Sequence, residues 1–286
     1  MNWVPLLFID DVCHRLNKPA FNQVSQLSGS WSEFGAEHHK KRRELKFRCR
    51  VSNQEVSYSM RDISRYSREL TVADLNLEFD RITSFECGSA SSNNHRVSRR
   101  LNGVSLREFE RDILPTIAPL VANCSLYLHA WRSAQTRIYF NAFKNSSVFN
   151  AITVQEQGEE SRDFVARQVE FGNVQTLTLY GTGGWPEEEN LAETLKIFVS
   201  SARFHEFNSP DLLIDGYELF ELFLERALAS ELKPGASISA PATNFDKNRL
   251  LHLRPDNSEK DEWRIPDSNL RIALSHYSGM LCVTVK

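Results

Sequence analysis

Val174-Gln-Thr-Leu-Thr-Leu179 is the segment from which the architecture of this chain is worked out. Its apolar residues have the LxxLxL spacing that is typical of the strand in a leucine-rich repeat. Phe149-Asn-Ala-Ile-Thr-Val154 has the same pattern with conservative exchanges. Anchoring on Leu126, Ile152 and Leu177 gives intervals of 26 and 25 residues, within the range of such repeats. We therefore expect a curved, leucine-rich-repeat-like stack of irregular βα units.

Strands and helices are predicted to alternate on both sides of this segment. The predicted strands are Cys124–His129, Ile152–Gln155, Val174–Tyr180, Phe204–Phe207 and Ala236–Ala240. The predicted helices are Leu106–Ala122, Ser161–Phe171, Glu187–Ser201 and Tyr217–Ala229. Further strands are expected at Glu262–Ile265, Leu270–Leu274 and Met280–Val285. The fold class is therefore α/β, with βα repeats over 106–240 and terminal strands over 262–286.

The region 44–100 is predicted to be rich in β-structure. Leu45, Phe47 and Cys49 alternate with basic residues, and a second alternating run follows the turn-forming Ser52-Asn53, which predicts a hairpin. The alternation of apolar residues over Leu75–Phe79 predicts another strand. Small polar residues over Gly88–Asn94 predict a loop.

Residues 1–43 form three short predicted helices. Pro5 starts the first helix, which carries an apolar face and ends near Asn17. The second has Pro19 in its first turn, and the third begins at Trp31 and runs into a basic end. Helices this short cannot bury their own apolar faces, so the rest of the chain or a partner protein must cover them.

Residues Val4 to Phe34 resemble an F-box without a gap. The family's opening Leu-Pro corresponds to Val4-Pro5, and its Trp corresponds to Trp31. The apolar positions of its first two helices correspond to Phe8, Ile9, Val12, Cys13, Leu16, Phe21, Val24 and Leu27. The family usually has an acidic residue where this chain has Leu7. That departure keeps open the alternative of a scaffold with a degenerate F-box.

The whole layout resembles the nematode families of F-box proteins with an F-box-associated domain, here 44–286. The resemblance implies a substrate adaptor of a Skp-cullin-F-box ubiquitin ligase, with no catalytic residue, cofactor or metal in this chain. Apolar side chains would bind the Skp-type adaptor. Those implied adaptor-binding residues are Pro5, Phe8, Ile9, Val12, Leu16 and Trp31.

The βα part is expected to bind the target protein, because a repeat stack offers a wide strand face whose outward positions are free of packing duty. On Val174–Tyr180 the apolar residues are assigned to the core, which leaves the alternate residues outward. The predicted target-binding residues are Tyr127, His129, Thr153, Gln155, Gln175, Thr178 and Tyr180.

Composition fits a globular protein of 286 residues, with 41% hydrophobic and 25% charged residues. The net charge of −3 argues against binding nucleic acid over a broad face. Five scattered cysteines indicate reduced thiols, and no secretory or membrane-spanning segment is predicted. We expect a cytoplasmic protein, or a nuclear one if Lys40–Arg43 acts as an import signal rather than as a solvated helix end.

Several sharper interpretations remain as alternatives. Gly181–Gly184 precedes a predicted helix and could cradle a phosphate in a small-ligand protein or enzyme, although a plain turn is favoured. Trp185 is a candidate for a partner contact or for burial. His38 and His39 are adjacent, which is a poor arrangement for one metal ion and favours a solvated helix end. Cys124 is expected to be an inert, buried thiol.

Overall fold

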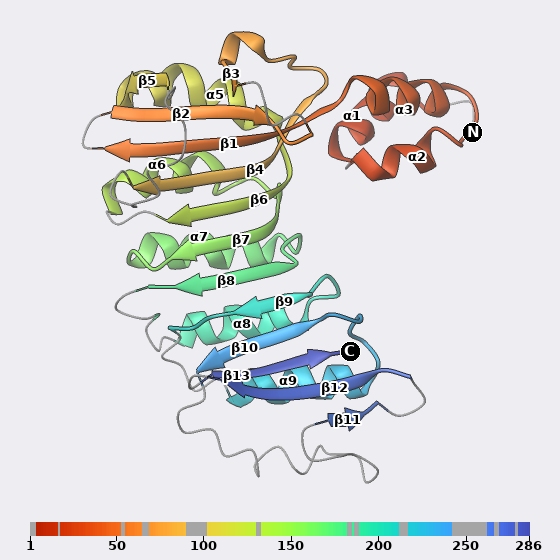
Figure 1. Ribbon diagram of the computed structural model, residues 1–286, viewed down its shortest axis with the longest axis vertical. Helices are drawn as coiled ribbons and strands as arrows, with labels where there is room; N and C mark the ends of the chain where they lie inside the picture. The colour runs from red at the N-terminus through yellow and green to blue at the C-terminus, as the bar shows by residue number, and fades with distance from the viewer. Residues whose placement is uncertain are drawn as a thin grey trace. The chain divides into compact units, whose positions relative to one another are not determined.

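The computed structural model divides the chain into two compact units, Met1–Phe143 and Lys144–Lys286. The boundary falls inside the predicted domain 44–286, and the N-terminal helices belong to the first unit. Both units are α/β, as predicted (Figure 1). The structure describes residues 4–16, 18–52, 55–64, 69–89, 102–129, 133–181, 185, 189–211, 217–241, 262–265, 269–277 and 280–286. Within these ranges no helix is both long and apolar enough to cross a membrane.

Three helices open the first unit. α1 (Leu6–Arg15) begins directly after Pro5, as predicted. The second predicted helix is shorter than expected, because only a 3-10 turn η1 (Lys18–Ala20) and α2 (Phe21–Val24) form. Leu27 therefore lies outside this helix, and it is exposed.

α3 (Ser30–Lys41) completes the helical unit and packs closely on α2. A Cβ atom at Gly35 of α3 would lie 2.8 Å from Val24, so only glycine permits this approach. The three helices share a small apolar core. It consists of Ile9, Cys13, Phe21 and Val24, with Val4, Leu16, Trp31 and Phe34 packed against it.

The sheet of the first unit has the strand order β6-β4-β1-β2-β3, with β5 also paired to β2. β1 and β2 form the predicted antiparallel hairpin, and β1, β4 and β6 run parallel. The strands are β1 (Arg43–Ser52), β2 (Glu55–Asp62), β3 (Glu69–Leu70), β4 (Asp80–Ser89), β5 (Asn102–Ser105) and β6 (Val121–His129).

The strand predicted at Leu75–Phe79 is wrong. A 3-10 turn, η2 (Val72–Asp74), leads into a turn over these residues, in which Leu77 is exposed and Phe79 is buried. The strand β4 follows instead, and it includes Gly88, which the sequence had assigned to a loop. β4 shows no simple alternation, because its pairing shifts between Ile82 and Ser84. That shift places Phe85 and Cys87 in the core.

Helices cover one face of this sheet. The predicted helix Leu106–Ala122 ends at Leu120 and is irregular, since Pro115 and Pro119 lack the N–H of a regular helix. The elements are α4 (Leu106–Glu108), a π turn η3 (Phe109–Ile113), α5 (Leu114–Ile117), a 3-10 turn η4 (Ala118–Leu120) and α6 (Ser133–Phe143). The helix α6 has no counterpart among the predicted helices.

Aromatic rings join these helices to the sheet. Phe109 packs against Phe47 and Tyr58, and Tyr139 packs edge-on against Phe85. In Figure 1 the strand β2 lies in front of α5, and β4 lies in front of α6. The covered face of the sheet therefore holds the core of the first unit, and the other face is turned away from these helices.

The second unit follows the predicted alternation of strands and helices. Its strands lie in the order β7-β8-β9-β10-β13-β12-β11, of which β7 to β10 are parallel and the last three are joined by antiparallel pairing. The strands are β7 (Phe149–Gln155), β8 (Thr176–Tyr180), β9 (Glu206–Asn208), β10 (Ser237–Pro241), β11 (Glu262–Arg264), β12 (Arg271–Tyr277) and β13 (Met280–Val285).

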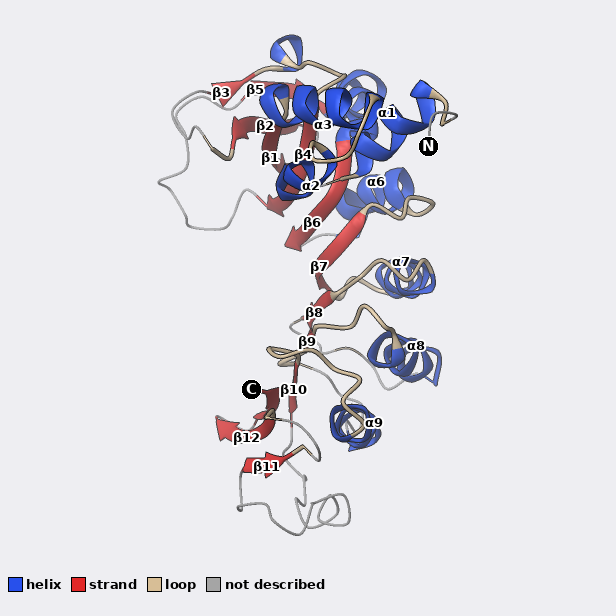
Figure 2. Ribbon diagram, turned by 90° about the vertical axis from the view of Figure 1, so that its right-hand side faces the viewer, coloured by secondary structure: helices blue, strands red, loops and turns tan. Residues whose placement is uncertain are grey.

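The helices α7 (Glu159–Glu170), α8 (Glu189–Ser200) and α9 (Tyr217–Leu228) lie on one side of these strands (Figure 2). Buried residues such as Leu177 and Phe207 face them. β7 to β10 are adjacent in the order in which they occur in the chain. There is therefore no reversal of strand order among them, and such a reversal is where open α/β sheets form their ligand crevice.

Candidate binding surfaces

The first turn of α1 exposes three consecutive apolar side chains. Leu6 is 56% exposed, Leu7 is 84% exposed and Phe8 is 53% exposed. Three consecutive helical residues span about 200° around the axis, so these side chains cover most of the free end of the helix. The ring of Phe8 also packs edge-on against Trp31, with the ring centroids 6.4 Å apart. Leu6, Leu7 and Phe8 are hereafter the α1 patch.

The structure divides the predicted adaptor-binding residues between the surface and the core. Pro5 and Phe8 are exposed, and Val12, Leu16 and Trp31 are half-buried. Ile9 is only 2% exposed and belongs to the core of the three helices, so the expectation that it lies on the surface is corrected. The helical period places Ile9 and Cys13 on the same inward side. Leu6 and Leu7 are exposed instead of Ile9, although the predicted set does not include them.

A buried polar network ties α1 to the end of α3. His38, 1% exposed, accepts a hydrogen bond at Nδ1 from the Arg42 guanidinium (3.2 Å), and its Nε2 lies 3.3 Å from an Asp10 carboxylate oxygen. Arg42 also donates to the carbonyl oxygens of Leu16 and, at 2.9 Å, Cys13. Its cation therefore donates to carbonyl groups at the C-terminus of α1, of which that of Cys13 also accepts from the backbone N–H of Leu16.

These contacts correct the expectation of a solvated helix end. His38 and Arg42 are buried, whereas His39, Lys40 and Lys41 are exposed. Burial lowers the pKa of His38, and it lowers the pKa of Arg42 to about 10. Both shifts follow from the cost of removing a charge from water.

Asp10, His14 and His38 form one group of potential metal ligands among the described residues. Arg42 donates to Nδ1 of His38, which places the ring proton on Nε2, the atom that would have to bind the ion. The adjacent guanidinium would also repel a cation. The group is therefore a hydrogen-bond network, and the contact of His14 with Asp10 at 3.1 Å extends it to the surface.

The helical unit is fixed to the sheet by polar contacts. Arg81 of β4 donates from Nε to the carbonyl oxygen of His14 at 3.2 Å, and the backbone N–H of Lys18 donates to Glu44 at 3.2 Å. Arg81 is buried, and its burial lowers its pKa to about 10. The α1 patch is thus presented from a helical unit that is docked on the sheet rather than tethered to it.

In the second unit, the predicted target-binding residues only partly share one surface. Thr153 lies opposite Thr178, and Gln155 lies opposite Tyr180. Thr153, Thr178 and Tyr180 are half-buried, and Gln175 is exposed just before β8. Gln155 is only 7% exposed, which corrects its assignment to the surface.

The register extends this surface across further strands. Thr178 lies opposite Asn208, Asn208 opposite Ser239, and Ser239 opposite Cys282. All five members of this row, Thr153, Thr178, Asn208, Ser239 and Cys282, are half-buried. One row of the open face of the second unit, hereafter the polar row, therefore consists of small, uncharged side chains, which alternate along each strand with residues that face the helices.

In the first unit, the predicted residues Tyr127 and His129 lie on the open face of β6. Tyr127 is 43% exposed, and the two rings stack with centroids 6.1 Å apart. The sequence had not assigned a role to the basic residues of the same face. Lys46, Arg48 and Arg50 occupy alternate positions of β1 and are half-buried. Their strong alternation with the core residues of β1 was the signal for this face.

The parallel pairing of β1 with β4 places these cations beside residues of β4. Lys46 lies opposite Ser84, Arg48 opposite Glu86, and Arg50 opposite Gly88. The Glu86 carboxylate forms an ion pair with Lys46, and Nε of Arg48 donates to it at 2.7 Å. One carboxylate is thus shared by two cations. Lys46, Arg48, Arg50, Arg61, Glu86, Tyr127 and His129 are hereafter the cationic sheet face.

The alternative ligand site at Gly181–Gly184 lies outside the described residues except for Gly181. A Cβ atom at Gly181 would lie 3.0 Å from Cβ of Glu156, so the close approach of the two loops explains this glycine. Trp185 is fully buried, and its indole N–H donates to the carbonyl oxygen of Tyr180 at 3.2 Å. The exposed-contact alternative for Trp185 is therefore wrong.

The five cysteines are free, and Cys124 is buried in β6, as expected. Burial raises the pKa of its thiol, which suppresses the reactive thiolate. Cys49 is buried beside Tyr139, with Sγ and Oη 3.1 Å apart. Burial raises the pKa of Cys49 as well, so both thiols are packing groups at neutral pH.

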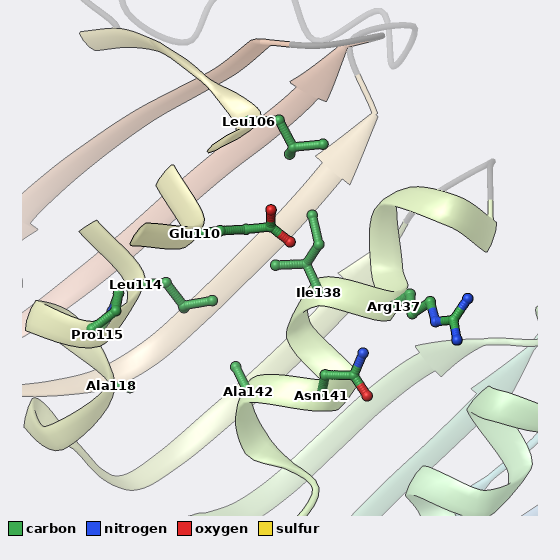
Figure 3. A pocket seen from close by; sticks show the side chains of 9 residues that line it. All are labelled: Leu106, Glu110, Leu114, Pro115, Ala118, Arg137, Ile138, Asn141 and Ala142. Carbon is green, nitrogen blue, oxygen red and sulfur yellow. The ribbon is translucent and has the colours of Figure 1, made fainter. Parts of the chain in front are cut away.

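An open groove of about 690 Å³ lies between the α4–α5 segment and α6 (Figure 3). Glu110 and Ile138 approach each other across it in the figure. Its lining residues are Leu106, Glu110, Leu114, Pro115, Ala118, Arg137, Ile138, Asn141 and Ala142. The lining is mainly apolar, and no described contact indicates an occupant, so we assign no role to this groove.

Comparisons with known proteins do not place the chain in a family. No family model matches it, and no curated protein matches it. Among solved structures it has a weak similarity to "MycE Methyltransferase from the Mycinamycin Biosynthetic Pathway in Complex with Mg, SAH, and Mycinamycin VI". That match has 9% identity and a TM-score of 0.25, and it covers 96% of this chain and 88% of the other. A similarity of this size carries no argument about fold or function.

Proposed function

We propose that this chain is a non-enzymatic adaptor that binds a Skp-type protein through its N-terminal helices and a target protein through its sheets. In that role it would deliver the target to a cullin-based ubiquitin ligase. The observation that carries the proposal is the α1 patch, in which Leu6, Leu7 and Phe8 are all more than half exposed. The resemblance of Val4 to Phe34 to an F-box supplies the identity of the partner.

The physical argument rests on the small size of the helical unit. Its core already contains Ile9, Cys13, Phe21 and Val24, so the α1 patch is what remains after internal packing. Burial of a large apolar side chain contributes about 1.5–3 kcal/mol, enough for two or three such residues to act as anchors of an interface. A partner that covers the free end of α1 would gain this energy.

The docking of the helices on the sheet favours an adaptor role. Contacts from Arg81 to His14 and from Lys18 to Glu44 fix the α1 patch relative to the sheet of the first unit. A fixed arrangement lets a protein hold one partner at a set distance from another. No reacting group of this chain takes part in that task, and the bound ligase would supply the chemistry.

Leu6→Asp and Phe8→Asp test the proposal directly. Each change places a charge in the α1 patch and should weaken binding of the full-length chain to a purified Skp-type adaptor by about 30-fold, or 2 kcal/mol. Binding is measured by titration calorimetry. Leu77→Asp is the matched control, because Leu77 is 60% exposed in a turn of the same unit.

Equal effects of the three changes would remove the α1 patch as the binding site. If the unaltered chain fails to bind the adaptor at micromolar concentration, the ligase role is lost and the degenerate-scaffold alternative takes its place. Ile9→Asp is unsuitable here, since Ile9 is a core residue and its replacement would unfold the helices. Trp31→Ala should have a smaller effect, because Trp31 is half-buried against the core.

A further inference from the structure

The cationic sheet face has its charges concentrated in the middle of the sheet. Lys46, Arg48 and Arg50 project from β1, and Arg61 lies opposite Lys46 on β2. Glu86 is the carboxylate in the middle of the face, and it already pairs with both Lys46 and Arg48. Glu44 and Glu55 lie on the same side of the hairpin, at the two ends of the face. Glu69 pairs with Arg61 from the adjoining strand β3. The middle of the face is therefore positively charged.

The opposite border of this face is aromatic. Tyr127 and His129 project from β6 and stack on each other. Between them and the cations, β4 contributes two small residues, Ser84 and Gly88, at either side of Glu86. An extended chain laid along β4 would thus meet cations on one side and aromatic rings on the other.

We propose that the cationic sheet face binds an extended, acidic peptide segment of the target protein. Assigning that segment to a target rests on the proposed function. Side-chain carboxylates of the peptide would bind the guanidinium of Arg48 and the ammonium of Lys46 in competition with Glu86. Tyr127 would pack against the apolar part of the segment.

Two features favour a peptide over single-stranded nucleic acid. Glu86 lies in the middle of the face, where it can accept an N–H from a peptide but would repel a phosphate backbone. Tyr127 and His129 stack on each other, which occupies ring faces that bases would need. A peptide can place a neutral residue opposite Glu86 and acidic residues opposite the cations, whereas a nucleic-acid strand carries a negative charge at every nucleotide.

Fluorescence anisotropy with the full-length chain tests the proposal. The probe is a fluorescein-labelled peptide in which Glu alternates with Thr, and its control has Gln in place of every Glu. At low salt the Glu peptide should bind at least ~10-fold more tightly than the Gln peptide, and added salt should reduce the difference. A labelled oligouridylate is the third probe.

The double variant Lys46→Gln, Arg48→Gln should weaken binding of the Glu peptide by about 10-fold or more. Arg111→Gln is the matched control, since Arg111 is an exposed, ion-paired arginine of the same unit outside this face. Glu86→Gln should strengthen binding by about 3-fold, because it releases two cations. A purely structural role for Glu86 would instead weaken binding and lower the melting temperature.

Three results would overturn the proposal. The first is equal binding of the Glu and Gln peptides, and the second is undiminished binding of the Glu peptide by the double variant with an unchanged melting temperature. The third is binding of the oligouridylate that is tighter than that of the Glu peptide and is weakened in the double variant. The last result would assign the face to nucleic acid. Failure of the Skp-type adaptor to bind would leave the peptide result intact, because the α1 patch and this face share no residue. The two proposals can therefore fail separately.

Discussion

The open sheet faces of the two units differ although both sheets carry helices on their other face. In the first unit Lys46 and Arg48 project beside Tyr127, whereas in the second the polar row carries small, uncharged side chains such as Thr178. The covered faces are apolar in both units. Packing thus constrains one face of each sheet, and the other face is free to acquire its own chemistry.

The interiors of the two units also differ in whether their buried polar side chains can carry a charge. The first unit buries charged or titratable groups, namely His38, Arg42, Asp62, Asp80 and Arg81. The buried polar side chains described in the second unit are all uncharged: Gln155, Ser161, Gln168, Thr194 and Ser209. We infer that the stability of the first unit depends on charge and pH, whereas that of the second rests on apolar packing.

Among changes to buried polar groups, the largest effect is expected for Arg42→Met. This change removes the side-chain donor to the carbonyl oxygens of Cys13 and Leu16 and to the Nδ1 atom of His38. Loss of these buried hydrogen bonds should reduce the free energy of unfolding of the helical unit by about 3 kcal/mol. Hydrogen exchange of the α1 and α3 amides measures it.

Lys40→Met is the control for this change, since Lys40 is exposed in the last turn of α3, two residues before Arg42. It should alter the free energy by no more than about 0.5 kcal/mol. Equal protection of the α1 amides in the two variants would show that the buried arginine does not hold the helices. The contrast between the interiors would then be unsupported.

A smaller effect is expected from pH. Burial, together with the charge of Arg42, lowers the pKa of His38 against the opposing contact with Asp10. As the pH falls, His38 therefore takes up a proton in the unfolded chain at a higher pH than it does in the folded chain. The contribution of His38 is present above its unfolded pKa of about 6.5 and is lost as the pH falls below it, by at most about 1.4 kcal/mol per pH unit.

His38→Gln separates this effect from other titrations, because Gln keeps polar atoms but does not titrate in this range. Hydrogen exchange of the α3 amides between pH 7 and pH 5 should lose part of its pH dependence in this variant, after correction for the intrinsic exchange rate. An identical dependence in both proteins would mean that His38 is not the sensitive group.

Much of the fold could be predicted from local periodicity. The β1–β2 hairpin and the strands of the second unit have clear alternation of apolar residues, and the structure confirms them. β4 could not be predicted, because its shifted pairing between Ile82 and Ser84 removes the alternation. The sequence pattern of Leu75–Phe79 is the same for a strand and for a turn. The segment forms a turn, and no strand among the described residues pairs with it.

The candidate surfaces were predicted less well, because burial depends on contacts that are distant in sequence. The exposure of Tyr127 follows from strand alternation and is confirmed. The burial of Arg42 depends on carbonyl groups 26 and 29 residues away, so a basic run alone could not reveal it. Gln155 has the alternation of an outward residue, yet the structure buries it.

The smallest effect is expected for Thr178→Lys on the polar row of the second unit. Thr178 lies between Thr153 and Asn208, whose small side chains leave room for a lysine, so the change in the free energy of unfolding should not exceed about 0.5 kcal/mol. Leu177→Lys is the matched comparison, because Leu177 is fully buried on the covered face. It should remove several kcal/mol by burying a charge. Urea denaturation measures both. Similar, large losses would mean that both faces of the strand are covered, and the second unit would then have no open face to compare with the cationic one.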